Sequence, residues 1–112
     1  MTKETALKLA SPFGGGVARH GEICGAVSGA LMALGLARGA EVPAKKEETY
    51  QLAQEFLRRF EEKHHALRCR DLIGCDLNTP EGHQKAVEKG VFRSLCPLLV
   101  SDAVEIVQAM LA

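Results

Sequence analysis

The sequence has no excess of charge of either sign. Lysine plus arginine total 14, aspartate plus glutamate also total 14, and the formal net charge at pH 7 is zero. Binding to phosphate backbones or anionic surfaces needs clustered positive charge, and no basic stripe occurs along the chain. The composition therefore argues against a nucleic-acid partner.

The sequence also has no apolar run that we expect to span a membrane. The apolar stretch from Ile23 to Ala37 is too short, because a spanning helix needs about 20 residues. The opening residues, MTKETALKLA, are mixed in polarity and do not resemble a secretory signal peptide. We therefore expect no membrane insertion and a cytoplasmic location.

The four cysteines, Cys24, Cys69, Cys75 and Cys96, form none of the common short motifs. No pair is spaced as CxxC, which argues against a thioredoxin-type pair and a zinc ribbon, and no CxxCH is present to attach haem. In the cytoplasm, cysteines are more often redox-active or metal-binding than part of a permanent disulfide framework. They are therefore the candidate functional residues.

Strand-like alternation of polar and apolar residues is not convincing in any window, whereas helical spacing occurs almost throughout. The segment after EVPAKKEE carries the strongest helical pattern. Its expected core face consists of Tyr50, Ala53, Phe56, Leu57 and Phe60. A chain of 112 residues is long enough for one core. The sequence predicts a single all-α domain over residues 1–112, a small bundle of about five helices.

Local signals place several helix ends. A helix from Thr5 to Phe13 should be broken by the triple glycine that follows, and Gly74 should end a short helix. Thr79 is the expected N-cap of a helix that starts at Pro80 and stops at Gly90. The last helix should begin at Pro97. Its expected core face consists of Val100, Ala103, Val104, Val107 and Leu111.

The segment between Gly21 and Gly39 contains small residues at a four-residue spacing. Glycine inside a helix costs roughly 1 kcal/mol relative to alanine, so close approach of another backbone is the expected compensation. The residues of this predicted groove are Gly21, Gly25, Gly29, Ala26, Ala30 and Ala33.

Two cysteines are expected at starts of long helices. If Gly21 caps its helix, Cys24 lies in the first turn, where free N–H groups and the helix dipole stabilise a thiolate. Because Pro97 fits the first helical position, Cys96 is the expected N-cap of the last helix. Both thiols would then face unpaired backbone amides.

Cys69 lies between Arg68 and Arg70 and opens a short helix, so charge and helix end both favour its thiolate. Cys75 precedes Asp76, whose charge opposes ionisation, and we treat it as auxiliary. We expect Cys24, Cys69 and Cys96 to converge in space and at least one of them to be unusually acidic.

The motif CGAVSG, which begins at Cys24, resembles the signature of a redox-active protein family named for four cysteines around a CGAxxG motif. CRDLIGCDL and CPLLVSDAVEIV resemble the segments that carry the family's third and fourth cysteines. The resemblance extends from Thr5 onward and implies that Cys24, Cys69 and Cys96 match three of the four family cysteines. Members of this family usually have an upstream helix with a further cysteine, and that cysteine is absent from this sequence.

Three interpretations remain open. The first is a small thiol-based redox or electron-transfer protein that uses Cys24, Cys69 and Cys96, with a redox partner that the sequence does not identify. The second is a metal or iron–sulfur module, because four thiolates suit zinc or a cluster equally well, and its ligands would be Cys24, Cys69, Cys75 and Cys96. The third is a helical interaction protein whose cysteines are buried as small hydrophobic residues.

Histidine spacing offers a partial metal alternative. His20 lies four residues before Cys24, and His65 lies four residues before Cys69. Each pair could share a helix face if the helix extended that far.

The missing upstream helix also predicts self-association. Without it, the face around Ala26, Ala30 and Ala33 has no covering element in the sequence. Because exposed apolar patches usually mark interfaces and a twofold axis lets one surface cover its own copy, we expect a homodimer.

Overall fold

The structure is a computed structural model that describes all residues from 1 to 112, and it is all-α, as the sequence predicts. It has five helices of eight residues or more and two shorter ones. The helices are α1 (Lys3–Ala10), α2 (Gly25–Arg38), α3 (Lys46–His64), α4 (Cys69–Ile73), α5 (Pro80–Lys89), α6 (Val91–Ser94) and α7 (Cys96–Leu111), with 3₁₀ turns at Ser11–Phe13 and Pro43–Lys45.

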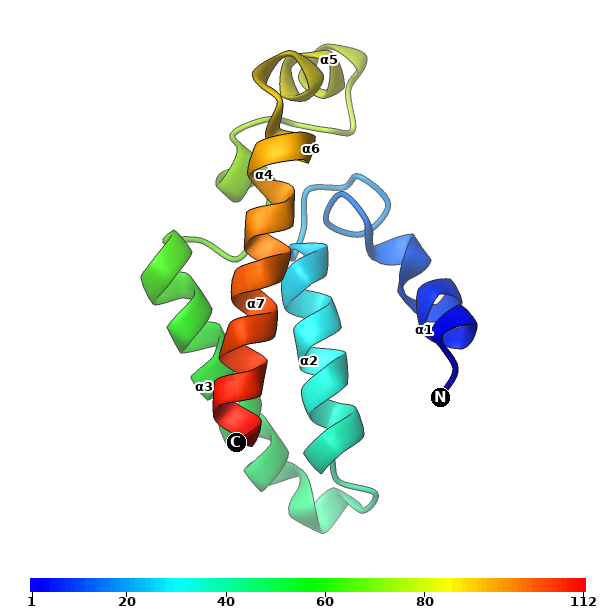
Figure 1. Cartoon of the computed structure of the whole chain (residues 1–112), viewed down its shortest axis with the longest axis vertical. Helices are drawn as coiled ribbons and strands as arrows, with labels where there is room; N and C mark the ends of the chain where they lie inside the picture. The colour runs from blue at the N-terminus through cyan, green and yellow to red at the C-terminus, as the bar shows by residue number, and fades with distance from the viewer.

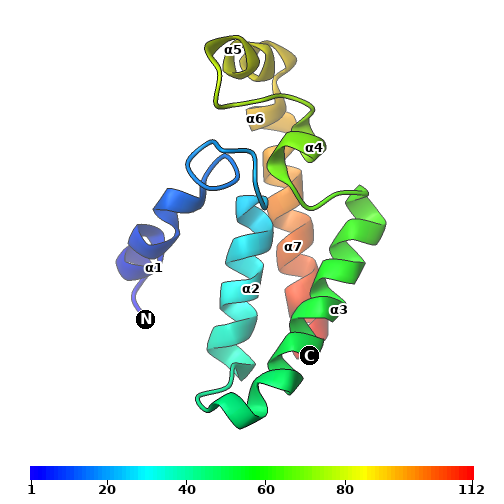
Figure 2. The ribbon, with the colours of Figure 1, turned by 180° about the vertical axis from the view of Figure 1, so that it is seen from behind.

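Three long helices, α2, α3 and α7, lie side by side and form a bundle (Figures 1 and 2). Their shared core buries Phe56 and Phe60 of α3 completely, with the two rings stacked at a centroid distance of 6.1 Å. The other buried members are Val27, Ala30, Leu34, Leu99 and Ala103. We call this region the bundle end of the molecule.

The buried face of α7 differs from the predicted one. Val100 and Val104 are about half exposed, whereas Leu99, Asp102 and Ala103 are buried. The buried face of α7 is therefore displaced by about one residue from the predicted one. The prediction is wrong because the sequence pattern gave no reason to place the Asp102 carboxylate inside. Tyr50, expected on the core face of α3, is also about half exposed.

Asp102 is tolerated in the core because its charge is paired. Its two carboxylate oxygens lie 2.8 Å from His64 Nε2 and 3.1 Å from Lys63 Nζ, both at the end of α3. The His64 ring also packs against Phe60, with centroids 4.8 Å apart. A buried carboxylate without such partners would be strongly destabilising.

The opposite end, which we call the thiol end, consists of residues 11–24 and 66–96. Its helix boundaries follow the predicted signals: the Thr79 side-chain hydroxyl accepts the N–H of Gly82, and α4 and α5 end at Gly74 and Gly90 in left-handed conformation. In Figure 1, α5 and α6 lie beyond the N-terminal end of α7. Short elements and loops therefore surround the start of the bundle.

The chain between α1 and α2 contains an unusual left-handed turn. Five consecutive residues, Gly15 to Arg19, have φ values between 50° and 69°. The predicted break at the triple glycine is confirmed, but Val17, Ala18 and Arg19 continue the left-handed path without glycine's freedom. Left-handed backbone costs such residues about 1–2 kcal/mol each.

No residue of α1 is buried, and α1 lies away from the bundle in both views (Figures 1 and 2). Leu7 and Leu9 on this helix are both more than half exposed. Short isolated helices are marginal in water. α1 therefore has no stabilising partner within the chain.

The segment Val91–Leu111, which joins α6 and α7, is long and apolar enough to cross a membrane by length and composition alone. The absence of membrane insertion, expected from the shorter stretch from Ile23 to Ala37, therefore stays a prediction. Core helices of helical bundles can have the same length and apolar composition. The Val91–Leu111 segment also carries Asp102, which is buried and paired with His64.

Candidate functional site

One short backbone pairing holds two of the candidate cysteines together. Ile23 and Arg68 form an isolated antiparallel bridge. Around it, the Cys24 N–H donates to the Leu67 carbonyl at 2.9 Å, and the Cys69 N–H donates to the Glu22 carbonyl at 2.7 Å. Because each cysteine directly follows a bridge residue, the starts of α2 and α4 are fixed beside each other.

Cys24 is the N-cap of α2, one residue outside the first turn where we expected it. Its carbonyl accepts the N–H groups of Val27 and Ser28, and its thiol makes no capping hydrogen bond. Gly21 does not cap this helix: its φ is 71°, and it lies before the bridge against the Arg70 side chain. The predicted stripe of three helical glycines therefore reduces to Gly25 and Gly29.

Cys96 is the first residue of α7 rather than its N-cap, which is Leu95. The Leu95 N–H donates to the Val91 carbonyl, and the Leu99 N–H donates to the Leu95 carbonyl, each at 3.0 Å. α6 thus runs into α7 with little interruption. The Cys96 thiol therefore lies within a nearly continuous helix and not at the free amides of a separate helix start, as we expected.

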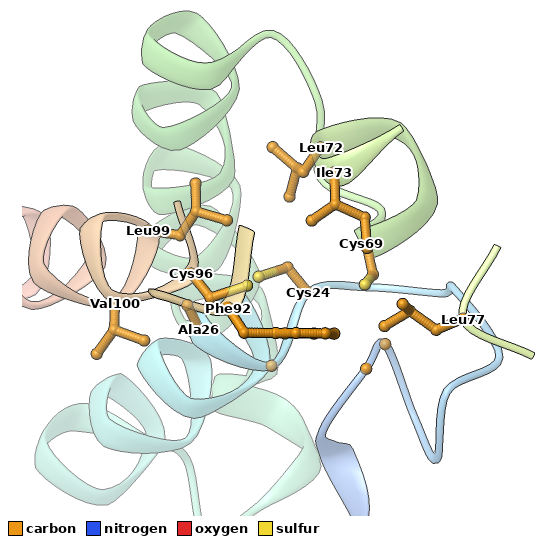
Figure 3. Close-up of a pocket in the computed structure, with 13 residues that line it drawn as sticks. Cys24, Ala26, Cys69, Leu72, Ile73, Leu77, Phe92, Cys96, Leu99 and Val100 are labelled. Carbon is orange, nitrogen blue, oxygen red and sulfur yellow. The ribbon is translucent and has the colours of Figure 1, made fainter. Parts of the chain in front are cut away.

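The structure confirms that Cys24, Cys69 and Cys96 converge. All three line a single cavity of about 310 Å³ at the junction of α2, α4, α6 and α7. In Figure 3, the Cys24 and Cys96 side chains point toward one another, and Cys69 reaches the same pocket from α4. The remaining lining residues are Gly15, Gly16, Gly25, Ala26, Leu72, Ile73, Leu77, Phe92, Leu99 and Val100.

The left-handed turn forms part of the wall. A Cβ atom on Gly16 would lie 2.7 Å from the Cys69 Cβ and 2.5 Å from the Glu22 carbonyl oxygen. Only glycine fits so close to the cysteine and its backbone. The Glu22 N–H donates to the Gly16 carbonyl at 2.9 Å, and this bond ties the turn to the strand-like segment before Cys24.

Burial dominates the electrostatics of Cys69. Burial, together with the neighbouring thiols of Cys24 and Cys96, raises the pKa of the Cys69 thiol to about 11. The predicted acidification by flanking arginines is wrong. Arg70 lowers the pKa of Cys69, but burial outweighs this effect. Its guanidinium donates to the carbonyls of His20 and Gly21, and Arg68 pairs with Glu22.

Burial also raises the pKa of the Cys96 thiol, and the neighbouring Cys24 adds to this effect. The expectation of an acidic thiol is therefore wrong for Cys69 and for Cys96. Cys24 and Cys96 are partly exposed, whereas Cys69 is buried. Cys24 lies at the N-terminal end of α2, where the helix dipole is positive.

Cys75 does not reach the pocket. It is buried, its sulfur is 3.6 Å from the Ile73 carbonyl oxygen, and it packs with Leu77, Ala86 and Val91. Cys75 therefore fits the interpretation of a buried small hydrophobic residue, in line with its predicted auxiliary status.

The side chains do not form a metal site as they stand. No group of three or more histidine, cysteine, aspartate or glutamate side chains is placed to hold a metal ion. His65 ends α3 in left-handed conformation, so it shares no helix with Cys69. His20 likewise lies outside α2. The four-cysteine ligand set does not fit zinc or a cluster in this arrangement.

Sequence reasoning missed two parts of this pocket. Phe92 forms a wall from α6, but nothing in its sequence context distinguished it from a surface residue. Gly15 and Gly16 were interpreted only as a chain break, although three adjacent glycines also allow a close approach of backbone to a thiol. A search for glycines that precede a cysteine motif could have found them.

A family model described as "Putative redox-active protein (C_GCAxxG_C_C)" matches residues 1–110. No curated protein and no solved structure matches the chain. The motif in the family's name has the order Gly-Cys-Ala, whereas in this chain Cys24 precedes Gly25 and Ala26. The match includes the three cysteines of the pocket and Cys75.

Proposed function

The chain belongs to the C_GCAxxG_C_C family, and from this premise we propose that it is a thiol-based redox or electron-transfer protein. The observation that carries the proposal is the meeting of Cys24, Cys69 and Cys96 at one pocket although they are distant in sequence. Buried cysteines that served only as core packing would have no reason to share a solvent-accessible cavity.

In this proposal Cys24 is the nucleophilic thiol. It is partly exposed and caps a helix of 14 residues, whose N-terminal amides favour negative charge. Cys96 is the resolving thiol, because it is also partly exposed and points toward Cys24 in Figure 3. The redox couple is then the Cys24–Cys96 dithiol and its disulfide.

Cys69 plays a different part. Its raised pKa keeps it protonated at neutral pH, and its side chain forms the inner wall of the pocket. A neutral thiol there limits the negative charge that the pocket must accommodate when Cys24 ionises.

The proposal is tested by redox titration with mixtures of reduced and oxidised dithiothreitol, followed by trapping and counting of free thiols. We expect a reversible two-electron transition in which two of the four thiols are lost. Cys24→Ser and Cys96→Ser should each abolish it. Cys75→Ser is the matched control and should leave it unchanged. Retention of all four thiols until the protein unfolds would contradict the proposal.

The two alternatives have less support. The interaction-protein interpretation explains Cys75 but not the partly exposed Cys24 and Cys96. The metal or iron–sulfur interpretation stays a prediction, and anaerobic metal analysis of the purified protein tests it directly. The four free thiols also suit a reducing compartment, so a cytoplasmic location remains part of the proposal.

We also propose that the protein forms a homodimer through the face predicted from its sequence. α2 and α7 border an open apolar groove of about 390 Å³. Its floor includes Gly29, where an added Cβ would meet no atom within 4 Å. Because this groove and α1 are both uncovered within one chain, a second copy is the occupant that can cover both.

A further inference from the structure

The wall of the thiol pocket carries no charged residue. Every lining residue is glycine, cysteine, alanine, leucine, isoleucine, valine or phenylalanine. The nearest guanidinium, that of Arg70, is already used by the carbonyls of His20 and Gly21 and by Glu22. No charged side chain in the lining is therefore available to pair with a carboxylate or ammonium group bound in this pocket.

The cavity is also small. Its volume of about 310 Å³ lies at the low end of the range for ligand pockets. Phe92 and Val100 are both partly exposed and present apolar surface at its rim. A short aliphatic chain on either side of a reactive sulfur–sulfur bond would bury its carbon atoms against these two side chains.

From this lining we infer that the pocket accepts a small, uncharged, apolar disulfide as the oxidant of the Cys24–Cys96 pair. The inference rests on the proposed thiol-redox function and adds the class of substrate. Charged disulfides are disfavoured because no charged side chain in the lining compensates for the hydration that they lose, whereas apolar carbon gains from burial.

The exchange balances without any further reactant. The Cys24 thiolate attacks one sulfur of R–S–S–R, so that a mixed disulfide forms between Cys24 and this sulfur, the original S–S bond breaks and one RS⁻ leaves. Cys96 then loses its proton and attacks the Cys24 sulfur, which releases the second RS⁻. The protons of the two cysteine thiols end on two RSH molecules, so the dithiol is oxidised by two electrons and the disulfide is reduced by two.

The test compares two short aliphatic disulfides, of which one is neutral and the other carries two negative charges. Diethyl disulfide is neutral, and dithiodipropionate carries two carboxylates on a similar aliphatic skeleton. Each rate with the reduced, full-length protein is divided by the rate of the same disulfide with N-acetylcysteine amide, which corrects for intrinsic reactivity. We expect the corrected rate for diethyl disulfide to be higher by about tenfold or more.

A matched pair of variants localises the effect. Val100→Lys places a cation at the pocket rim and should remove most of the preference for the neutral disulfide. Val87→Lys is the control, because Val87 is equally exposed (50% against 51%) but lies on α5 outside the pocket. It should leave the preference unchanged.

Equal corrected rates for the two disulfides, or a preference for the dicarboxylate in the unmodified protein, would overturn the inference and leave the thiol-redox function intact. Failure of both disulfides to oxidise the protein would contradict the function itself. The wild-type comparison decides the matter even if Val100→Lys does not fold.

Discussion

The bundle end and the thiol end of this molecule are stabilised in different ways. At the bundle end, long helices bury whole aromatic side chains, as Phe56 and Phe60 show. At the thiol end, a second core formed by short elements, with Ile73 and Ala86 among its buried members, is joined by special backbone contacts: a single bridge, a glycine packed against Cys69, and a strained left-handed turn. The comparison teaches that long regular helices provide the platform and that the reactive groups lie where the elements are short and backbone geometry is special.

The largest expected difference between the two ends lies in their phenylalanines. Phe56→Ala should lower the free energy of unfolding by about 4 kcal/mol because it empties a fully buried site. Phe92→Ala should cost about 1 kcal/mol or less, because Phe92 is partly exposed beside the pocket. Urea unfolding of both variants measures the contrast, and similar losses would show that the thiol end is packed as firmly as the bundle.

The next effect concerns the one charge buried in the bundle. Burial alone would raise the pKa of Asp102, but hydrogen bonds and charge from Lys63 and His64 outweigh it and hold the pKa below its ordinary value. The ionised carboxylate therefore contributes stability above the unfolded pKa of about 4, and this contribution is lost as the pH falls through the lower folded value.

Asp102→Asn should accordingly cost about 2 kcal/mol at pH 7 and should flatten the loss of stability on acidification. Glu105→Gln is the control on the same helix, because Glu105 is exposed and has no ion pair. Unfolding free energies measured between pH 7 and pH 3 test both variants. An unchanged acid dependence in Asp102→Asn would contradict the role given to this pair.

A smaller and opposite effect is expected at the strained turn. Val17→Gly should stabilise the protein by about 1 kcal/mol, because glycine removes the steric cost of left-handed backbone at φ 65°. Val87→Gly, in the exposed interior of α5, should instead destabilise it by about 1 kcal/mol. Thermal unfolding distinguishes the two signs, and destabilisation by Val17→Gly would argue against strain at this turn.

The smallest effect on the folded chain is expected in the α2–α7 groove, where the readout is association. Gly29→Leu should not clash within the chain, because no atom lies within 4 Å of its added Cβ, but it should fill the groove and weaken a dimer. Gly25→Leu is less suitable, since its Cβ would lie 3.0 Å from the Phe13 carbonyl oxygen.

Light scattering at micromolar concentration with reductant present measures the mass. We expect a dimer for the natural sequence and a larger monomer fraction for Gly29→Leu. A monomer for the natural sequence would contradict the proposed homodimer.

The bundle end was largely predictable from sequence, because it depends on period and on local caps. Helical spacing located α2, α3 and α7, and Thr79, Gly74 and Gly90 marked helix ends as expected. The error on α7 arose because hydrophobic spacing cannot foresee that Asp102 is buried against residues of another helix.

The thiol end was predictable only in part. The convergence of three cysteines followed from their positions at helix starts, but their electrostatics did not. Sequence neighbours such as Arg68 and Arg70 suggested acidic thiols, whereas burial in three dimensions raises the pKa of Cys69. The left-handed path through Val17 had no signal either, because valine, alanine and arginine rarely adopt positive φ.

The central claim, that Cys24 and Cys96 form the redox couple, is tested most directly by mapping the disulfide that forms on mild oxidation. The protein is oxidised with a small excess of diethyl disulfide, free thiols are alkylated at low pH, and the digested peptides are identified by mass spectrometry. The expected result is a peptide pair linked through Cys24 and Cys96, with Cys69 and Cys75 recovered as alkylated free thiols. A linkage that includes Cys75, or recovery of all four residues as free thiols, would contradict it.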